Sequence, residues 1–385
     1  MIKKYLYLIG ITFLFSCSKQ TPQENKLTNQ IRIDLNGDQR KESVDEFIHD
    51  FKVDFINDSV IPIEGYPDKI IEYDDGLILV DSKNAQEIYV LNNKLHVINI
   101  INAFGGGPKE YLEIYDVIYI AKKEKLVIMD LKKMIEYDLD GKFLRSVPFN
   151  YNPDRLDYFD NNYIVWNDSR PLEQGNFHRY NLLNNDYGLT ASQIPFKSIE
   201  EKFNREPASA VFQNKNAIYF SSWMNDTLYY LNKKNHTVNK LLLDFQSKSA
   251  KDIDLSTFTN ASQVDEYNER NRTILWEYPA MLKDYFLSVI VDNGKVKVLL
   301  QNLDNGSYYL SPSNMNMFDL LILEALMEEN LVTNNSIKFL AEIELIQQLF
   351  EVKNESERLH FNEKDFEKHR KASYAIVTIN LKDKL

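Results

Sequence analysis

Short apolar runs recur along the chain between polar turn residues, and a Tyr-x-Leu triplet follows each of them. The runs are residues 77–80 (LILV), 126–129 (LVIM), 163–166 (YIVW) and 217–220 (AIYF). Apolar runs of about four to eight residues bounded by turn signals are typical of β-strands that are buried on both faces. The triplets begin at Tyr89, Tyr137, Tyr180 and Tyr229. The pattern therefore predicts an all-β chain made of repeated units.

The repeat has a regular period, because the triplets are 48, 43 and 49 residues apart. In the first two units we predict strands at 69–73, 77–81, 87–91 and 95–100, and at 115–121, 125–130, 134–138 and 143–149. A period in the forties with four antiparallel strands is typical of a β-propeller blade, which buries both faces against its neighbours. A pair of sandwiched sheets is the alternative, but it does not explain the period.

The rest of the chain completes six blades. The fourth blade is predicted to open at 208–212 and end at 238–245, and the fifth to use 273–278, 285–291, 295–301 and 308–311. We predict a partly helical insertion at 246–272 and helices at 318–327, 339–350 and 364–370. The last strand, 374–381, is expected to join an early strand at 52–63 and close the ring. The predicted fold is a six-bladed β-propeller of four-stranded antiparallel blades.

The N-terminus has the layout of a secretory signal peptide at residues 1–16. Two lysines precede an apolar run that is shorter than the roughly 20 residues needed to span a bilayer. The run ends in Leu14-Phe15-Ser16-Cys17, which is similar to the bacterial lipobox, and Cys17 is the only cysteine. We therefore predict lipidation of Cys17, a polar tether at 17–29 and a single propeller domain at 30–385. A buried, unmodified cysteine is the alternative.

Composition excludes several function classes. The chain has 45 Lys+Arg against 57 Asp+Glu, a net charge of −12, which argues against binding to nucleic acid. One cysteine allows no intramolecular disulfide and no thiolate zinc site. The six histidines are scattered, and residues 34–38 lack the distal Glu and the helices of a calcium loop. Residues 105–109 lack the Ser/Thr and the helix of a phosphate loop. We expect no metal and no cofactor.

Four segments carry a resemblance to a known family. They are residues 60–64 (VIPIE), 103–111 (AFGGGPKEY), 137–143 (YDLDGKF) and the C-terminal strand. Over most of its mature length the chain resembles the six-bladed β-propeller lipoproteins of Bacteroidota, which are related to NHL- and TolB-like propellers. That family commonly carries a Gly-x-Gly-Pro-x-Glu-Tyr loop after its first blade, and residues 105–111 match it. The resemblance implies a propeller, an envelope location and a binding role; it supplies no catalytic residues.

Strand alternation predicts which loops share a face of the propeller. The loop between the second and third strands of a blade leaves on the same face as the loop to the next blade. Residues 105–111 should therefore lie on one face with 81–86, 130–133, 168–176 and 221–226. The residues that we predict for a binding face are Gly105, Gly106, Gly107, Tyr111, Trp166, Arg170 and Trp223. Either tryptophan could instead pack between blades.

The sequence thus favours a membrane-anchored binding or scaffolding module over an enzyme. Its expected partners are membrane lipid through Cys17 and a protein, peptide or glycan of the envelope. The alternative is a lyase or hydrolase with its site at the mouth of the propeller channel, although no nucleophile or metal motif is present. We expect a monomer on the periplasmic side of the outer membrane rather than the cell surface, since Ser18-Lys19-Gln20 replace the acidic residues of surface-exported lipoproteins.

Overall fold

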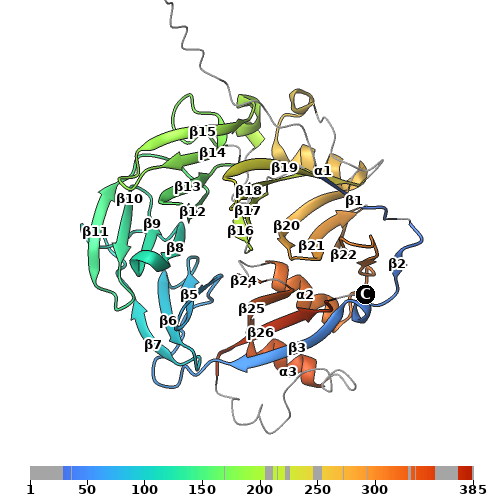
Figure 1. The fold of residues 1–385 in the computed structure, drawn as a ribbon, viewed down its shortest axis with the longest axis horizontal. Helices are drawn as coiled ribbons and strands as arrows, with labels where there is room; N and C mark the ends of the chain where they lie inside the picture. Colours follow the sequence, from blue (N-terminus) through green and yellow to red (C-terminus); the bar gives the residue numbers. More distant parts are fainter. Residues whose placement is uncertain are drawn as a thin grey trace, which may run out of the picture.

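The computed structural model shows six β-sheets arranged as a ring around a central axis (Figure 1). It describes residues 29–35, 37–168, 170–203, 211–214, 216–221, 226–245, 254–271, 273–292, 294–327, 331–333, 335–351 and 372–383. The predicted six-bladed β-propeller is therefore confirmed. The predicted signal peptide, Cys17, Trp223 and the predicted helix at 364–370 lie outside the described residues.

Blades 1 to 3 are four-stranded antiparallel sheets. Blade 1 contains β4 (Lys69–Tyr73), β5 (Gly76–Asp81), β6 (Glu87–Asn92) and β7 (Val97–Ile101). Blade 2 contains β8 (Asp116–Ile120), β9 (Lys125–Met129), β10 (Lys133–Tyr137) and β11 (Phe143–Pro148). Blade 3 contains β12 (Arg155–Phe159), β13 (Asn162–Trp166), β14 (His178–Leu183) and β15 (Leu189–Pro195). The strands predicted for the first two units agree with these bounds to within about two residues.

Blades 4 and 5 each gain a fifth strand from the N-terminal segment. Blade 4 contains β16 (Val211–Gln213), β17 (Ala217–Phe220), β18 (Thr227–Asn232) and β19 (Thr237–Asp244), and β1 (Asn29–Arg32) pairs in parallel with β19. Blade 5 contains β20 (Thr273–Met281), β21 (Tyr285–Asp292), β22 (Lys295–Asn302) and β23 (Tyr308–Leu310), and β2 (Arg40–Lys41) pairs in parallel with β23. The added strands cover two outer edges that would otherwise be open.

Blade 6 joins the two ends of the chain. It contains β24 (Leu331–Val332), β25 (Ser336–Glu342), β26 (Tyr374–Leu381) and β3 (Ile48–Phe55). The pairing of β26 with β3 confirms the predicted closure. The predicted bounds of the early strand, 52–63, are wrong: β3 ends at Phe55, and residues 56–68 form the connection to blade 1.

The helices lie mainly in the connections of blades 3 to 6. They are α1 (Ala261–Asn271), α2 (Met317–Met327), α3 (Ile343–Glu351) and the short 3-10 turns η1 (Val44–Glu46), η2 (Ala121–Lys123), η3 (Ser198–Phe203) and η5 (Leu255–Thr257). The helices predicted at 318–327 and within 246–272 are confirmed. A single helix at 339–350 is wrong, because β25 continues to Glu342 before α3 begins. Pairing of β25 with β26 overrides the helical spacing of its apolar residues.

Packing between blades explains the apolar runs in the sequence. Every residue of β5, β9 and β21 is buried. Six clusters of buried apolar side chains occupy the six interfaces between neighbouring blades. A central strand contacts a neighbouring blade on each face, so both alternating sets of its side chains are buried. The sequence of such a strand is therefore a continuous run of apolar residues, without the alternation of apolar and polar residues seen in half-buried strands.

A buried ionic cluster joins blades 2 and 3. The Glu136 carboxylate forms ion pairs with Lys125 Nζ (2.5 Å) and Arg145 Nη2 (2.7 Å). It also accepts a hydrogen bond from the Tyr187 hydroxyl (2.7 Å). Burial raises the pKa of Glu136, but the hydrogen bonds from Arg145, Lys125 and Tyr187 outweigh burial and lower that pKa to about 2. Glu136 therefore stabilises the folded state while it is ionised.

We expect this cluster to make the propeller sensitive to acid. The contribution of Glu136 to the free energy of unfolding is complete above the unfolded pKa of 4.5 and is lost as the pH falls from there toward 2. At pH 7, Glu136→Gln should lower the free energy of unfolding by about 3 kcal/mol, because Lys125 and Arg145 lose their counter-charge. Urea unfolding should show that most of this difference has disappeared at pH 3. A difference that stays constant between pH 7 and pH 3 would contradict the assignment.

Candidate functional site

The long connections of the propeller lie on one face. This face carries the connections between blades and those between the second and third strands of each blade. We call it the upper face. The helices α1, α2 and α3 all lie in such connections, whereas the turns of the lower face, such as those at residues 74–75 and 160–161, are short. Because a rigid scaffold with variable loops is the usual place for binding residues, the upper face is the candidate functional face.

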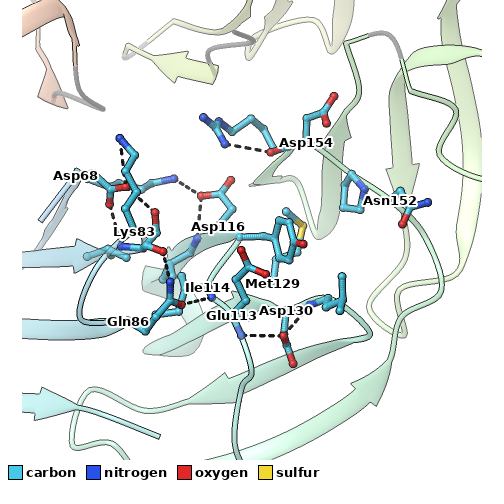
Figure 2. Close-up of a pocket in the computed structure, with 18 of the residues that line it drawn as sticks. Asp68, Lys83, Gln86, Glu113, Ile114, Asp116, Met129, Asp130, Asn152 and Asp154 are labelled. Carbon is cyan, nitrogen blue, oxygen red and sulfur yellow. Dashed lines mark hydrogen bonds and ion pairs between the residues drawn. The ribbon is translucent and has the colours of Figure 1, made fainter. Parts of the chain in front are cut away.

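A cavity of about 850 Å³ opens on the upper face where blades 1, 2 and 3 meet the central axis. Figure 2 shows Asp68, Asp116 and Asp154 around this opening, with Lys83, Glu113 and Asn152 at its edge. These residues come from the starts of the innermost strands β4, β8 and β12 and from the connections beside them. Further lining residues are Lys69, Gln86, Tyr115, Asp130, Leu131, Tyr151, Arg155, Arg170 and Met327.

Two aspartates of the cavity occupy the same position in the repeat. The backbone N–H of Asp68 donates to Val80, and that of Asp154 donates to Trp166, at the last turn before each innermost strand. The carboxylate of Asp68 then accepts from the N–H (3.1 Å) and hydroxyl (2.5 Å) of Ser82. Asp154 accepts from the N–H of Asp168 (2.6 Å). Both carboxylates thereby fix the connection between the second and third strands of their blades.

Asp116 joins the three blades that surround the cavity. Its carboxylate accepts from Lys69 Nζ of blade 1 (2.5 Å) and from the backbone N–H of Leu156 of blade 3 (2.8 Å). It also accepts from the N–H of Val117 (2.8 Å). Because one buried carboxylate bonds to all three blades, the floor of the cavity is held in a fixed geometry.

Four other residues that line the cavity have solvent-exposed side chains. The carboxylate of Glu113 is exposed and forms no hydrogen bond or ion pair with the described residues. Arg170 is 39% exposed and lies 3.2 Å from Asp154. Tyr115 and Leu131 present exposed aromatic and aliphatic surface beside these charges. The cavity thus offers a cation, an anion and apolar contact area within one opening.

The buried carboxylates of the cavity are hydrogen-bonded to the propeller itself. The carboxylates of Asp68, Asp116, Asp130 and Asp154 each accept hydrogen bonds from backbone or side-chain donors of the propeller itself. They therefore hold the connections of the propeller in place around the opening. Within the part of the chain that the structure describes, no three His, Cys, Asp or Glu side chains gather in a way that could hold a metal ion.

Comparison with known proteins places this chain in a family. A family model described as a domain of unknown function, DUF4934, matches residues 56–370, from the connection before blade 1 into blade 6. The chain belongs to the DUF4934 family. No curated protein matches the sequence of this DUF4934 chain.

A solved structure shares the fold of the DUF4934 chain. A protein of Bacteroides fragilis NCTC 9343, named as a candidate exported protein, is 11% identical with a TM-score of 0.69, over 92% of this chain and 100% of that one. A DUF4221-family member of Bacteroides vulgatus ATCC 8482 is 9% identical with a TM-score of 0.49, over 87% of this chain and 97% of that one. The first likeness confirms, for the fold, the resemblance to propellers of Bacteroidota. Lipidation stays a prediction.

The glycine-rich loop of the DUF4934 chain is explained by its own folding. Gly107 donates its backbone N–H to the Glu110 carboxylate (2.7 Å), and a Cβ on Gly105 would lie 2.3 Å from that carboxylate. The Tyr111 hydroxyl is buried and donates to the Gln86 carbonyl (2.7 Å). Lys133 of blade 2 donates to the Gly107 carbonyl (2.9 Å). The loop is thus hydrogen-bonded to both blade 1 and blade 2. Its Tyr111 contacts Gln86, and Gln86 lines the cavity.

Of the other residues predicted for the binding face of this DUF4934 protein, one lines the cavity and one is buried between blades. Arg170 lines the cavity. Trp166 is fully buried and stacks on Phe220 between blades 3 and 4, with ring centroids 4.9 Å apart, which is the inter-blade position left open by the sequence. Gly106 is exposed on the loop at 105–111, and Trp223 lies outside the described residues.

Sequence reasoning missed most of the residues that line the cavity. Asp68, Lys83, Glu113, Tyr115 and Asp154 were not singled out, although they come from three successive blades. Aligning the blades on their innermost strands would have placed Asp68 and Asp154 at one repeat position. The triplet Tyr-x-Leu, by contrast, marks the third strand and carries no information about the channel mouth.

Among the helices of the described residues, none is long and apolar enough to cross a bilayer.

Proposed function

We propose that this protein is an exported, lipid-anchored binding module of the cell envelope whose upper face holds a protein partner. The observation that carries the proposal is the cavity of about 850 Å³ between blades 1, 2 and 3, in which fixed carboxylates surround exposed charged and apolar groups. A rigid opening of this kind costs little reorganisation when a partner binds.

Exposed apolar residues around the cavity favour a protein over a glycan. Phe104, Leu112, Tyr115 and Leu131 are all exposed on the connections of blades 1 and 2. The backbone N–H of Glu113 donates to Asp130 (3.2 Å), so the connections that carry Leu112 and Leu131 are hydrogen-bonded to each other. Aliphatic and aromatic side chains beside a polar opening are typical of the core of a protein interface. A glycan would gain little from the aliphatic members of this set.

The direction of β1 supports an upper face that points away from the membrane. β1 pairs in parallel with β19, which runs from the lower to the upper face, so the chain enters blade 4 from the lower side. Cys17, the predicted lipid site, lies only 12 residues before the first residue of β1. The lower face would then lie nearer the membrane, and the cavity would face a partner on the opposite side.

A pair of matched leucines tests whether the upper face is the binding face. Leu131 at the cavity is 45% exposed, and Leu144 on β11 at the outer edge of the same blade is 44% exposed. A photo-crosslinking amino acid at position 131 in living cells should give a discrete protein adduct, whereas one at position 144 should give none. The adducts are detected by immunoblotting and identified by mass spectrometry. Equal adducts from both positions, or an adduct from position 144 alone, would refute an upper-face partner site.

A further inference from the structure

One ion pair in the wall of the cavity is incompletely hydrogen-bonded. The Asp154 side chain is 2% exposed, and its Oδ1 lies 3.2 Å from Arg170 Nη2. Neither Asp154 Oδ1 nor Arg170 Nε has a hydrogen-bond partner among the described residues. Burial raises the pKa of Asp154, as expected for a carboxylate that is enclosed with one oxygen unsatisfied. A buried ion pair offsets the cost of its burial only when its remaining hydrogen bonds are also formed, so an incompletely bonded pair in a cavity wall calls for an explanation.

The equivalent aspartate of blade 1 shows what is missing in blade 3. Both oxygens of Asp68 are hydrogen-bonded to Ser82, one by its N–H and the other by its hydroxyl. The residue of blade 3 that donates its N–H to Asp154 is Asp168, whose side chain has no hydroxyl group. Its carboxylate lies 3.7 Å from Arg179 instead. Blade 3 therefore keeps the loop-fixing bond, while the second oxygen of Asp154 is enclosed and lies 3.2 Å from the Arg170 guanidinium.

An acceptor beside a donor is complementary to the main chain of an extended peptide. In an extended strand, the N–H and C=O of one residue point to the same side, which is how strands exchange pairs of hydrogen bonds. Asp154 Oδ1 and Arg170 Nε are both enclosed in the structure, and the 39% exposed Arg170 side chain is the group that an incoming segment would have to displace to reach them. An N–H donated to Asp154 and a C=O accepting from Arg170 Nε would satisfy both groups at once.

We propose that Asp154 and Arg170 bind the main chain of an extended segment of the protein partner, with Leu131 and Tyr115 receiving an apolar side chain of that segment. This inference rests on the proposed function and assigns the chemistry by which the same cavity recognises its partner. Main-chain hydrogen bonds give affinity for many sequences, and the apolar contact beside them selects among those sequences.

A peptide screen with matched variants tests this assignment. The full-length protein, purified in detergent, is screened against a bead-bound random hexapeptide library and, in parallel, against an oligosaccharide array. The dissociation constant of the best peptide is then measured by fluorescence anisotropy. Asp154→Asn should weaken binding roughly 10- to 100-fold, because it replaces a charged acceptor at Oδ1. Arg170→Gln should weaken it similarly. Asp186→Asn, the same charge change at an 88% exposed side chain on a lower-face turn, should leave binding unchanged.

N-methylation of the peptide tests whether Asp154 contacts the peptide directly or only supports the fold of the site. Methylating the residue that donates to Asp154 should weaken binding to the natural protein but add little to the loss in Asp154→Asn, since both changes remove one hydrogen bond. Asp154→Asn retains an oxygen for the Asp168 N–H and is expected to fold; thermal unfolding checks this. If it does not fold, Arg170→Gln carries the same test.

Two results of the peptide screen would overturn the assignment. One is binding of oligosaccharides without binding of any peptide, and another is a peptide whose affinity is unchanged by Asp154→Asn and Arg170→Gln. If position 131 gives a crosslink in cells but Asp154→Asn and Arg170→Gln bind the peptide as tightly as the natural protein, the proposal of an upper-face partner site is supported. The proposal that Asp154 and Arg170 bind the main chain is then refuted. If no crosslink forms at position 131 and no peptide binds, both proposals fail.

Discussion

Replacing Trp166 by alanine is expected to lower the melting temperature of the propeller by roughly 5–10 °C. The indole is fully buried between blades 3 and 4, where it stacks on Phe220 and lies 5.7 Å from the ring of Tyr229. Removing a buried tryptophan typically costs about 3–5 kcal/mol, because the apolar contacts are lost and a cavity remains. Differential scanning calorimetry of the purified protein measures the change.

The phenylalanine variant is the matched control for this prediction. Trp166→Phe keeps an aromatic ring against Phe220 and removes the indole N–H, which is buried without a hydrogen-bond partner among the described residues. We expect its melting temperature to stay within about 3 °C of the natural protein, because the lost area is offset by the removal of an unsatisfied donor. If Trp166→Ala melts like the natural protein, the ring does not contribute to the interface between blades 3 and 4.

Replacing Cys17 by serine is expected to move nearly all of the protein from the membrane fraction to the soluble fraction of cells. Each buried CH₂ of an acyl chain contributes ~0.8 kcal/mol to membrane binding, and more than one chain is needed for stable anchoring. A serine hydroxyl in place of the thiol cannot form the thioether that would carry these chains. Detergent phase partition of cell extracts, with labelled palmitate as the tracer, measures both anchoring and acylation.

The neighbouring serine provides the control for the anchor. Ser18→Ala changes a side chain next to Cys17 without touching the thiol, so both membrane association and palmitate label should persist. Because Cys17 is the only cysteine, no other thiol can take up label by the same chemistry. Palmitate incorporation that survives Cys17→Ser, or membrane association that is unchanged, would refute the lipidation.

The blade strands could be predicted because their burial pattern is local. Residues 77–80 and 126–129 are apolar without interruption, and the structure buries all of them inside β5 and β9 between neighbouring blades. Gly76 begins β5, and an added Cβ there would lie 1.9 Å from the carbonyl oxygen of Leu91 on the neighbouring strand β6. These features depend on contacts within one blade or on the general need to bury both of its faces.

The errors arose where a distant segment decides the local structure. The residues of β25 have an ambiguous pattern, and pairing with β26, more than thirty residues away, makes them a strand. The parallel strands β1 and β2 are short and are stabilised by the edges of blades 4 and 5, so no periodicity of their own marks them. Trp166 was predicted for the binding face with packing between blades as the alternative, because its position in β13 does not show which neighbour covers it; the structure buries it between blades 3 and 4.

The sequence by itself determined the repeat, the number of blades and the closure of the ring by the two chain ends, because each follows from periodic burial along the chain. Only the tertiary structure decided that the candidate site lies where blades 1, 2 and 3 meet, with Asp154 and Arg170 in its wall. The physical reason is that a cavity is formed by residues far apart in sequence. Whether both oxygens of Asp68 or of Asp154 are hydrogen-bonded depends on one donor from the connection after the second strand of the blade.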